Sequence, residues 1–126
     1  MLITITAQET VLVIGAGPIG LSAMEFVRLT GARLIVMDMV QSRLDFVQKI
    51  YNLTDTVCAD GTEADLNKIK EMTRNELCDV VIDATGSDRS MNRSLEFCAF
   101  GGRVVYVGIT QGLLSFPHAP LLHRRE

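Results

Sequence analysis

The sequence lacks the features that mark a disulfide scaffold or a metal site. Its three cysteines, Cys58, Cys78 and Cys98, are odd in number and form no C-x-x-C pair. We therefore expect no disulfide framework and favour a reducing, cytoplasmic compartment. The two histidines, His118 and His123, lie far along the chain from all three cysteines, whereas a zinc site needs closely spaced ligands. We assign no metal ligand and no catalytic residue to this chain.

Long apolar runs and a strong charge of one sign are also missing. No apolar run approaches the ~20 residues that a membrane-spanning helix needs, and Met1–Ile5 is too short and uncharged for a signal peptide. The net charge is −3, with acids and bases interspersed, and the one basic pair, Arg124–Arg125, stands at the chain end. These absences argue against export, a membrane partner and a nucleic-acid partner.

The residues that are present alternate between strand and helix patterns. The chain has 126 residues, 48% of them hydrophobic, which predicts one domain over residues 1–126. We expect strands at residues 10–14, 34–38, 56–58, 79–83 and 103–108. The first helix should span 18–30. Ser42 with Asp45 and Thr62 with Asp65 resemble capping boxes for the second and third helices, and a fourth helix should run from about 87 to the Gly101–Gly102 pair.

This alternation predicts an α/β fold with a Rossmann-type doubly wound parallel sheet of five main strands in the order 3-2-1-4-5. A ligand should bind where the order reverses, over the strand ends at Gly15–Ile19 and Ala84–Gly86, with Val107–Ile109 lining the far half. We expect Gly112–Glu126 to be largely irregular. The edge of the fifth strand would then be unpaired, which favours a weak homo-oligomeric contact there.

The most informative stretch is the strand 10–14 with the glycine-rich turn that follows it. Gly15 can end the strand with a backbone angle that a side chain forbids, and Gly17 leaves the main chain open to a close ligand. Gly20 lies in the first helical turn, where a side chain would push the helix off the sheet. Pro18 suits the helix start, since its missing N–H would have no intrahelical partner. The remaining N–H groups and the helix dipole would stabilise an anion such as a pyrophosphate.

Asp38 supplies the second half of this pattern. It ends the next apolar run, 18 residues after Gly20, where an acid can accept hydrogen bonds from both hydroxyls of an adenosine ribose. The two features together predict a bound dinucleotide, with NAD favoured over NADP because an exposed carboxylate repels a 2′-phosphate. The alternative is a strand–turn–helix whose glycines serve only packing and whose Asp38 is a solvated carboxylate.

Several motifs resemble one known family. Val11–Leu21 is similar to the cofactor-binding turn of medium-chain, zinc-type alcohol and polyol dehydrogenases. So is the pairing of Asp83–Gly86 with Gly101–Gly108, while Leu121–Glu126 resembles the segment before that family's last sheet strand. The resemblance covers Thr10–Glu126, and it implies an oxidoreductase that uses NAD.

The resemblance implies roles for residues at the ends of the first two strands. The pyrophosphate would be held by Gly15, Gly17, Pro18 and Ile19. Asp38 would bind the adenosine ribose. Arg43 matches a basic residue that contacts the same ribose and shields the adenine; alternatively, it is an exposed arginine at a helix start. Met39 stands where NADP-binding variants often place an arginine, which also favours NAD.

The resemblance also implies contacts for the other half of the cofactor. Thr85 and Gly86 would lie along its backbone. Val107, Gly108 and Ile109 match main-chain groups near the nicotinamide amide.

The departures from the family pattern concern the catalytic parts. In this family a separate domain before the cofactor domain supplies the zinc ligands and the proton relay, and nothing before Thr10 resembles it. The leading interpretation is the NAD-binding domain of a zinc-dependent dehydrogenase, which positions nicotinamide for hydride transfer from a secondary alcohol or polyol. Two alternatives remain: a non-enzymatic NAD-binding regulatory module, and a methyltransferase that binds S-adenosylmethionine.

We predict that the isolated 126-residue chain oxidises no alcohol, because its sequence offers neither a zinc cluster nor a proton relay. Incubation with NAD, zinc and a panel of polyols, followed by absorbance of NADH, checks this. Zinc-dependent turnover by the purified chain would contradict it.

Overall fold

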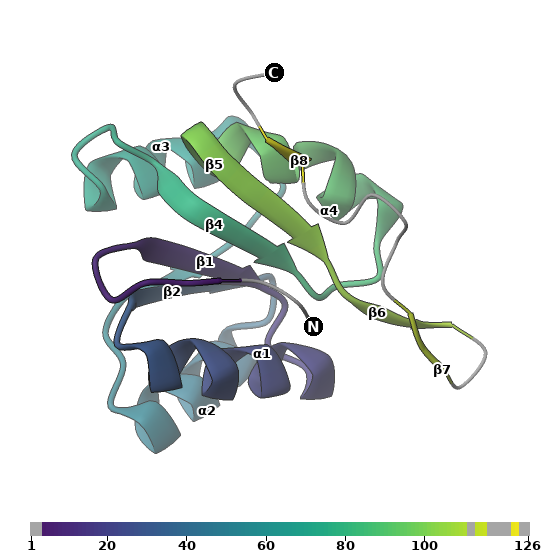
Figure 1. The fold of residues 1–126 in the computed structure, drawn as a ribbon. Helices are drawn as coiled ribbons and strands as arrows, with labels where there is room; N and C mark the ends of the chain where they lie inside the picture. Colours follow the sequence, from purple (N-terminus) through teal and green to yellow (C-terminus); the bar gives the residue numbers. More distant parts are fainter. Residues whose placement is uncertain (1–3, 111–112, 116–121, 124–126) are drawn as a thin grey trace.

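Five parallel strands form the centre of the molecule, and helices cover both of their faces (Figure 1). The structure is a computed structural model that describes residues 4–110, 113–115 and 122–123. In chain order the strands are β1 (Thr10–Ile14), β2 (Arg33–Asp38), β3 (Thr56–Cys58), β4 (Cys78–Asp83) and β5 (Cys98–Tyr106). They lie in the order β3-β2-β1-β4-β5 and all pair in parallel. The expected fold class and strand order are confirmed.

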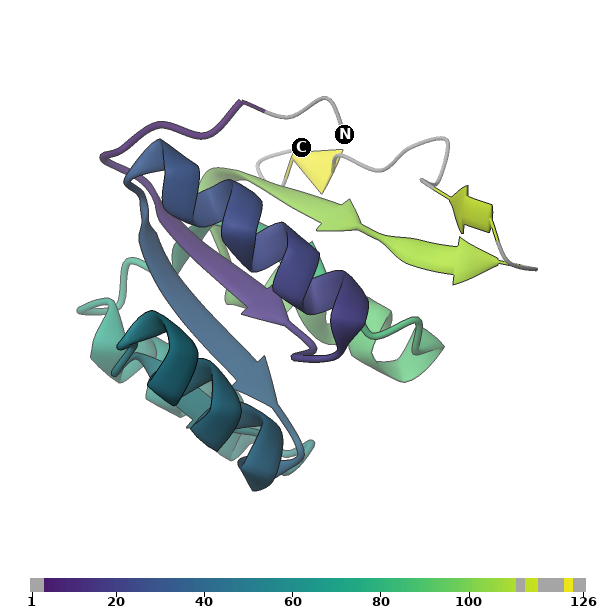
Figure 2. The same cartoon turned by 90° about the horizontal axis from the view of Figure 1, so that it is seen from below.

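The helices divide between the two faces of the sheet (Figures 1 and 2). Helices α1 (Pro18–Thr30) and α2 (Gln41–Tyr51) pack on one face. Helices α3 (Glu63–Met72) and α4 (Asp88–Arg93), with the short 3₁₀ helix η1 (Ser94–Phe97), pack on the other.

The central strands contribute to the cores on both faces. Val11 and Val13 of β1 join the cluster under α1 and α2, whereas Leu12 and Ile14 join the cluster under α3 and η1. All four side chains are buried, because alternate residues of a strand face opposite sides of the sheet. Phe97 fills the second core, and burial of such an aromatic side chain contributes about 1.5–3 kcal/mol.

The starts of the helices depart from the expected caps in two places. Helix α2 begins at Gln41, and no side chain caps it, so the capping box predicted for Ser42 and Asp45 is wrong. The Thr62 hydroxyl does cap α3, accepting a hydrogen bond from the Ala64 N–H at 3.2 Å. Asp65, however, is fully buried and accepts hydrogen bonds from the N–H groups of Asp60 and Gly61 instead of closing a capping box.

Strand β5 begins earlier than the pattern predicts. The fourth helix ends at Arg93 and gives way to η1, and the chain is already extended at Cys98 rather than at Arg103. Cys98 pairs with Cys78 and Arg103 with Val80, so β5 carries extra residues between these partners. Gly102 lies in this bulge, where a Cβ atom would stand 2.7 Å from the Asp79 carbonyl oxygen. A glycine that looked like a helix stop instead allows two strands to approach.

The segment after β5 is more regular than expected. Strands β6 (Gly108–Thr110) and β7 (Leu113–Ser115) form an antiparallel pair that projects from the sheet (Figure 1). Strand β8 (Leu122–His123) pairs antiparallel with β5. Residues 112–126 were expected to be largely irregular; β7 and β8 are the regular pieces that the structure describes there, and the rest of that segment lies outside the described residues. The expected open edge on β5 is wrong along Arg103 and Val104, where β8 covers it.

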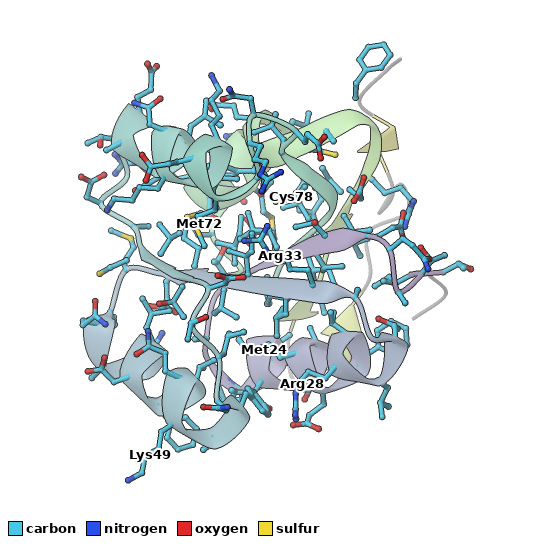
Figure 3. The ribbon with its side chains drawn as sticks, turned by 90° about the vertical axis from the view of Figure 1, so that its left-hand side faces the viewer. Met24, Arg28, Arg33, Lys49, Met72 and Cys78 are labelled. Atoms are coloured by element: carbon cyan, nitrogen blue, oxygen red, sulfur yellow. The ribbon has the colours of Figure 1, made fainter. Side chains whose placement is uncertain are left out.

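An arginine ties the amino end of the sheet to α3 (Figure 3). Arg33, the first residue of β2, donates to the Asp55 carboxylate at 2.9 Å and to the Met72 carbonyl at 2.9 Å. Burial raises the pKa of the neighbouring Cys78 thiol to about 12, so this thiol stays protonated. This end of the sheet is structural.

The two glycines of the turn after β1 give a stability prediction. A Cβ atom on Gly20 would lie 1.7 Å from the Gly15 carbonyl oxygen, whereas a Cβ atom on Gly17 would meet nothing within 4 Å. Gly20→Ala should therefore lower the free energy of unfolding by about 2 kcal/mol or more, since the clash exceeds the gain of about 1 kcal/mol in helix propensity. Gly17→Ala should stay within about 0.5 kcal/mol of wild type. Urea unfolding of both variants checks this, and equal midpoints would contradict it.

Candidate functional site

A cavity of about 550 Å³ opens at the carboxyl ends of the strands. It spans the point where the order reverses between β1 and β4, as a doubly wound sheet predicts. Its walls come from the turn after β1, the end of β2 with the start of α2, the loop after β3, and the loop and helix after β4. The lining residues are Ile14, Gly15, Gly17, Pro18, Ile19, Met37, Asp38, Met39, Val40, Arg43, Ala59, Asp60, Gly61, Ala84, Thr85, Ser87, Arg89, Ser90 and Arg93.

Most of the residues predicted from sequence meet at this cavity. Those that line it are Gly15, Gly17, Pro18, Ile19, Asp38, Arg43 and Thr85. Gly86 belongs to the same loop as Thr85 and has a left-handed backbone, with φ +68°, but it does not line the wall. Val107 is buried in the core beside α1. For Gly108 and Ile109 the structure gives only their place in β6.

The turn after β1 leaves the N-terminus of α1 open to the cavity. Gly15 adopts φ +103°, and its N–H donates to the Met37 carbonyl at 2.8 Å. Gly17 is the N-cap residue of α1, no side chain caps that end, and Pro18 follows as the first helical residue. The helix start therefore presents backbone donors and a positive dipole to the cavity wall.

The Asp38 carboxylate joins the first two strand ends. One oxygen accepts the Ala16 N–H at 2.7 Å and the other accepts the Val40 N–H at 2.7 Å. Asp38 is only 7% exposed, so the expectation of an exposed carboxylate is wrong: the turn after β1 folds over it. A carboxylate has about four acceptor positions, and these two contacts leave acceptor capacity toward the cavity.

Arg43 stands beside this carboxylate in the first turn of α2. Its Nη1 atom lies 3.8 Å from the Asp38 carboxylate, and its side chain is 56% exposed. A contact this long and this exposed contributes at most about 1 kcal/mol. The guanidinium therefore remains available to a ligand at the cavity wall.

A second buried carboxylate, which the sequence analysis did not single out, builds the loop after β4. Asp83 is fully buried and accepts hydrogen bonds from the hydroxyls of Thr85, Ser90 and Ser94, at 2.6–2.7 Å, and from the Thr85 N–H at 3.0 Å. The Thr85 hydroxyl also accepts the Ser87 N–H at 3.0 Å. The hydroxyl hydrogen of Thr85 is thus donated to Asp83, and Thr85 offers the cavity mainly its backbone and methyl group.

A buried ion pair fixes the opposite wall. Asp65 of α3 accepts the N–H groups of Asp60 and Gly61, both at 3.0 Å, and pairs with Arg93 of α4 at 3.2 Å. Arg93 also donates to the Thr62 carbonyl at 2.9 Å. The loop after β3 and helix α4 are therefore held directly together at one side of the cavity.

Within the described ranges, no group of three or more metal-binding side chains lies together. None of the three cysteines, all of which are described, forms a disulfide. No helix of the described part is both long and apolar enough to cross a bilayer. His118 lies outside the described residues.

An open parallel sheet with an uncapped helix start and an acid in one cavity is the arrangement typical of nucleotide-binding α/β proteins. Residues 18–126 match the family model described as "Zinc-binding dehydrogenase", and the chain belongs to that family. The resemblance found in the sequence is thus confirmed.

Two curated relatives have polyol or sugar-acid names. The chain is 35% identical over 123 residues to the L-galactonate-5-dehydrogenase of Escherichia coli (strain K12), covering 97% of this chain and 35% of that protein. It is 33% identical over 117 residues to the probable D-xylulose reductase A of Emericella nidulans, covering 90% of this chain and 32% of that protein. The chain spans about a third of the length of these curated relatives.

A solved structure agrees in fold. Alcohol dehydrogenase TADH from Thermus sp. ATN1 is similar with a TM-score of 0.74 and 29% identity, over 91% of this chain and 34% of that one.

The Asp83 contacts give a prediction for the loop after β4. Asp83→Asn should lower the free energy of unfolding by about 1–3 kcal/mol, because the amide replaces an acceptor oxygen with donors that face buried hydroxyls. Glu96→Gln, which removes an exposed charge nearby, is the control and should change it by less than about 0.5 kcal/mol. Urea unfolding measures both. If the two variants unfold alike, Asp83 does not hold this loop.

Proposed function

We propose that residues 1–126 form the NAD-binding domain of a zinc-dependent alcohol or polyol dehydrogenase, which positions nicotinamide to accept hydride from a secondary alcohol. The observation that carries this is the meeting of the Asp38 carboxylate and the uncapped start of α1 in one cavity. Family membership and the names of the two curated relatives support the substrate class.

Each group would hold one part of the cofactor. The backbone from Gly17 to Ile19 would bind the pyrophosphate, because the first turn of α1 has donors without intrahelical partners. Asp38 would accept the adenosine ribose hydroxyls, and Arg43 would flank the same ribose. The loop at Thr85 and Gly86 would lie along the cofactor, with its shape fixed by Asp83.

The other half of the cofactor would extend past the end of β5. Val107, Gly108 and Ile109 would approach the nicotinamide amide through main-chain groups. Holding the ring in one orientation would lower the entropic part of the barrier to hydride transfer.

The cofactor, when bound, supplies the hydride acceptor, and zinc in a separate catalytic domain would polarise the substrate oxygen. No zinc role is assigned to this chain's own residues. The length of the relatives supports a second domain in the whole protein. We propose a cytoplasmic location, because three cysteines that form no disulfide are typical of a reducing compartment. We assign no nucleic-acid or membrane partner, and self-association remains a proposal.

The two alternatives are less well supported. Methyltransferases of this kind usually carry an antiparallel last strand, and β8 pairs antiparallel with β5 over the described residues Leu122 and His123. The family match favours the dehydrogenase over both the methyltransferase and the regulatory module. Calorimetric titration with NADH and with S-adenosylmethionine tests the choice: binding of S-adenosylmethionine alone would overturn the proposal.

Cofactor preference gives a sharper prediction. Wild type should bind NAD roughly a hundredfold more tightly than NADP. A 2′-phosphate 4 Å from Asp38 costs about 1–4 kcal/mol, and the lost hydroxyl contacts cost about 1.5–3 kcal/mol. Asp38→Ser should weaken NAD binding and narrow the gap. Dissociation constants for both cofactors measure this.

Asp45→Asn is the matched control, since it removes an exposed carboxylate from helix α2, seven residues after Asp38 and outside the cavity lining. Its preference for NAD should equal that of wild type. Equal affinity of wild type for NAD and NADP, or an unchanged preference in Asp38→Ser, would remove the role given to Asp38.

A further inference from the structure

Arg89 is a cavity-lining residue with no role in the proposed function. It is the second residue of α4, exposed, and lies one turn before Arg93 on the same helix face. Arg93 is engaged by Asp65 and the Thr62 carbonyl. In the described ranges, no carboxylate oxygen lies within 4.0 Å of a nitrogen of Arg89, so its guanidinium has no ion-pair partner there.

The Arg89 guanidinium reaches across the cavity to the loop after β3. A Cβ atom built on Gly61 would lie 3.9 Å from the Arg89 Nη2 atom. Gly61 has φ +83° and no side chain, so its backbone lies close to the guanidinium. Arg89, which follows β4 in the chain, thus lies beside the loop that follows β3.

The opposite wall is preorganised. Asp65 holds the N–H groups of Asp60 and Gly61, and its pairing with Arg93 holds the same carboxylate against α4. The spacing between the Gly61 backbone and helix α4 is therefore fixed by buried contacts rather than by a ligand.

The order of the strands indicates which part of a nucleotide would occupy this space. Neighbouring strands lie about 4.8 Å apart. The pyrophosphate would bind at the end of β1, and the ribose at Asp38 at the end of β2. The base is attached to the ribose on the side away from the phosphates. Going from β1 to β2 and onward in the sheet, the next strand end is that of β3, and the loop after it contains Gly61.

We propose that Arg89 stacks its guanidinium on the adenine ring of the bound nucleotide, beside Gly61. The inference rests on the proposed nucleotide-binding function. A guanidinium plane is suited to this contact because it is flat, permanently charged and attracted to the face of a π-system. The fixed Gly61 backbone would then cover the rim of the same ring.

The test measures dissociation constants of the 126-residue chain for adenosine, AMP and nicotinamide mononucleotide by NMR titration. Arg89→Leu should weaken adenosine and AMP by the same factor, about three- to thirtyfold, and leave nicotinamide mononucleotide unchanged. Arg89→Lys should retain part of the affinity, because it keeps the charge and loses the plane. Arg74→Leu is the control: it removes an exposed arginine beyond α3, outside the cavity lining.

The outcomes separate the two proposals. A loss confined to AMP, with adenosine unaffected, would show that Arg89 contacts phosphate and would overturn the stacking. Equal affinities in Arg89→Leu and Arg74→Leu would also overturn it, while nucleotide binding by wild type would leave the proposed function standing. If wild type binds neither NADH nor adenosine, the proposed function itself fails, and the role of Arg89 fails with it.

Discussion

The candidate site depends on one buried group, the Asp38 carboxylate, which accepts hydrogen bonds from the Ala16 and Val40 N–H groups. It fixes the turn after β1 relative to the end of β2, so that the start of α1 and the start of α2 face the same cavity. A buried charge is stable only when hydrogen bonds satisfy it, and here the two backbone groups do so while the cavity side retains acceptor capacity. The same carboxylate thus holds the turn after β1 and presents an acceptor to the cavity, which is why the proposed function assigns the ribose diol to it.

Two further buried carboxylates repeat this arrangement at neighbouring strand ends. Asp83 holds the loop after β4 through hydroxyl groups, and Asp65 holds the loop after β3 through backbone N–H groups and Arg93. Loops at the carboxyl end of a parallel sheet have no ladder to support them, so each needs its own acceptor. Three buried acids thus hold the loops on three sides of the cavity by hydrogen bonds that form without a ligand.

The sequence was sufficient for those features that depend on local pattern. The alternation of strands and helices predicted the sheet order, and the glycine-rich turn with Asp38 predicted the part of the cavity wall at the ends of β1 and β2. Features that depend on distant partners were missed. Asp65 matches a capping pattern, yet it is buried because Arg93, 28 positions away, approaches it. Ser42 fails as a cap because the chain turns directly after Asp38, whose carboxylate already engages the Val40 N–H. Asp83 is bonded to Ser94 across a turn and a helix, a pairing that no periodicity encodes.

The contact between Gly20 and the Gly15 carbonyl has a consequence for how such a site tolerates sequence change. Because a Cβ atom there would lie 1.7 Å from that oxygen, the distance between α1 and the sheet is set where main chain meets main chain. The backbone donors at the start of α1 therefore keep their place only while residue 20 has no side chain, since a larger residue would move the helix start away from the end of β1.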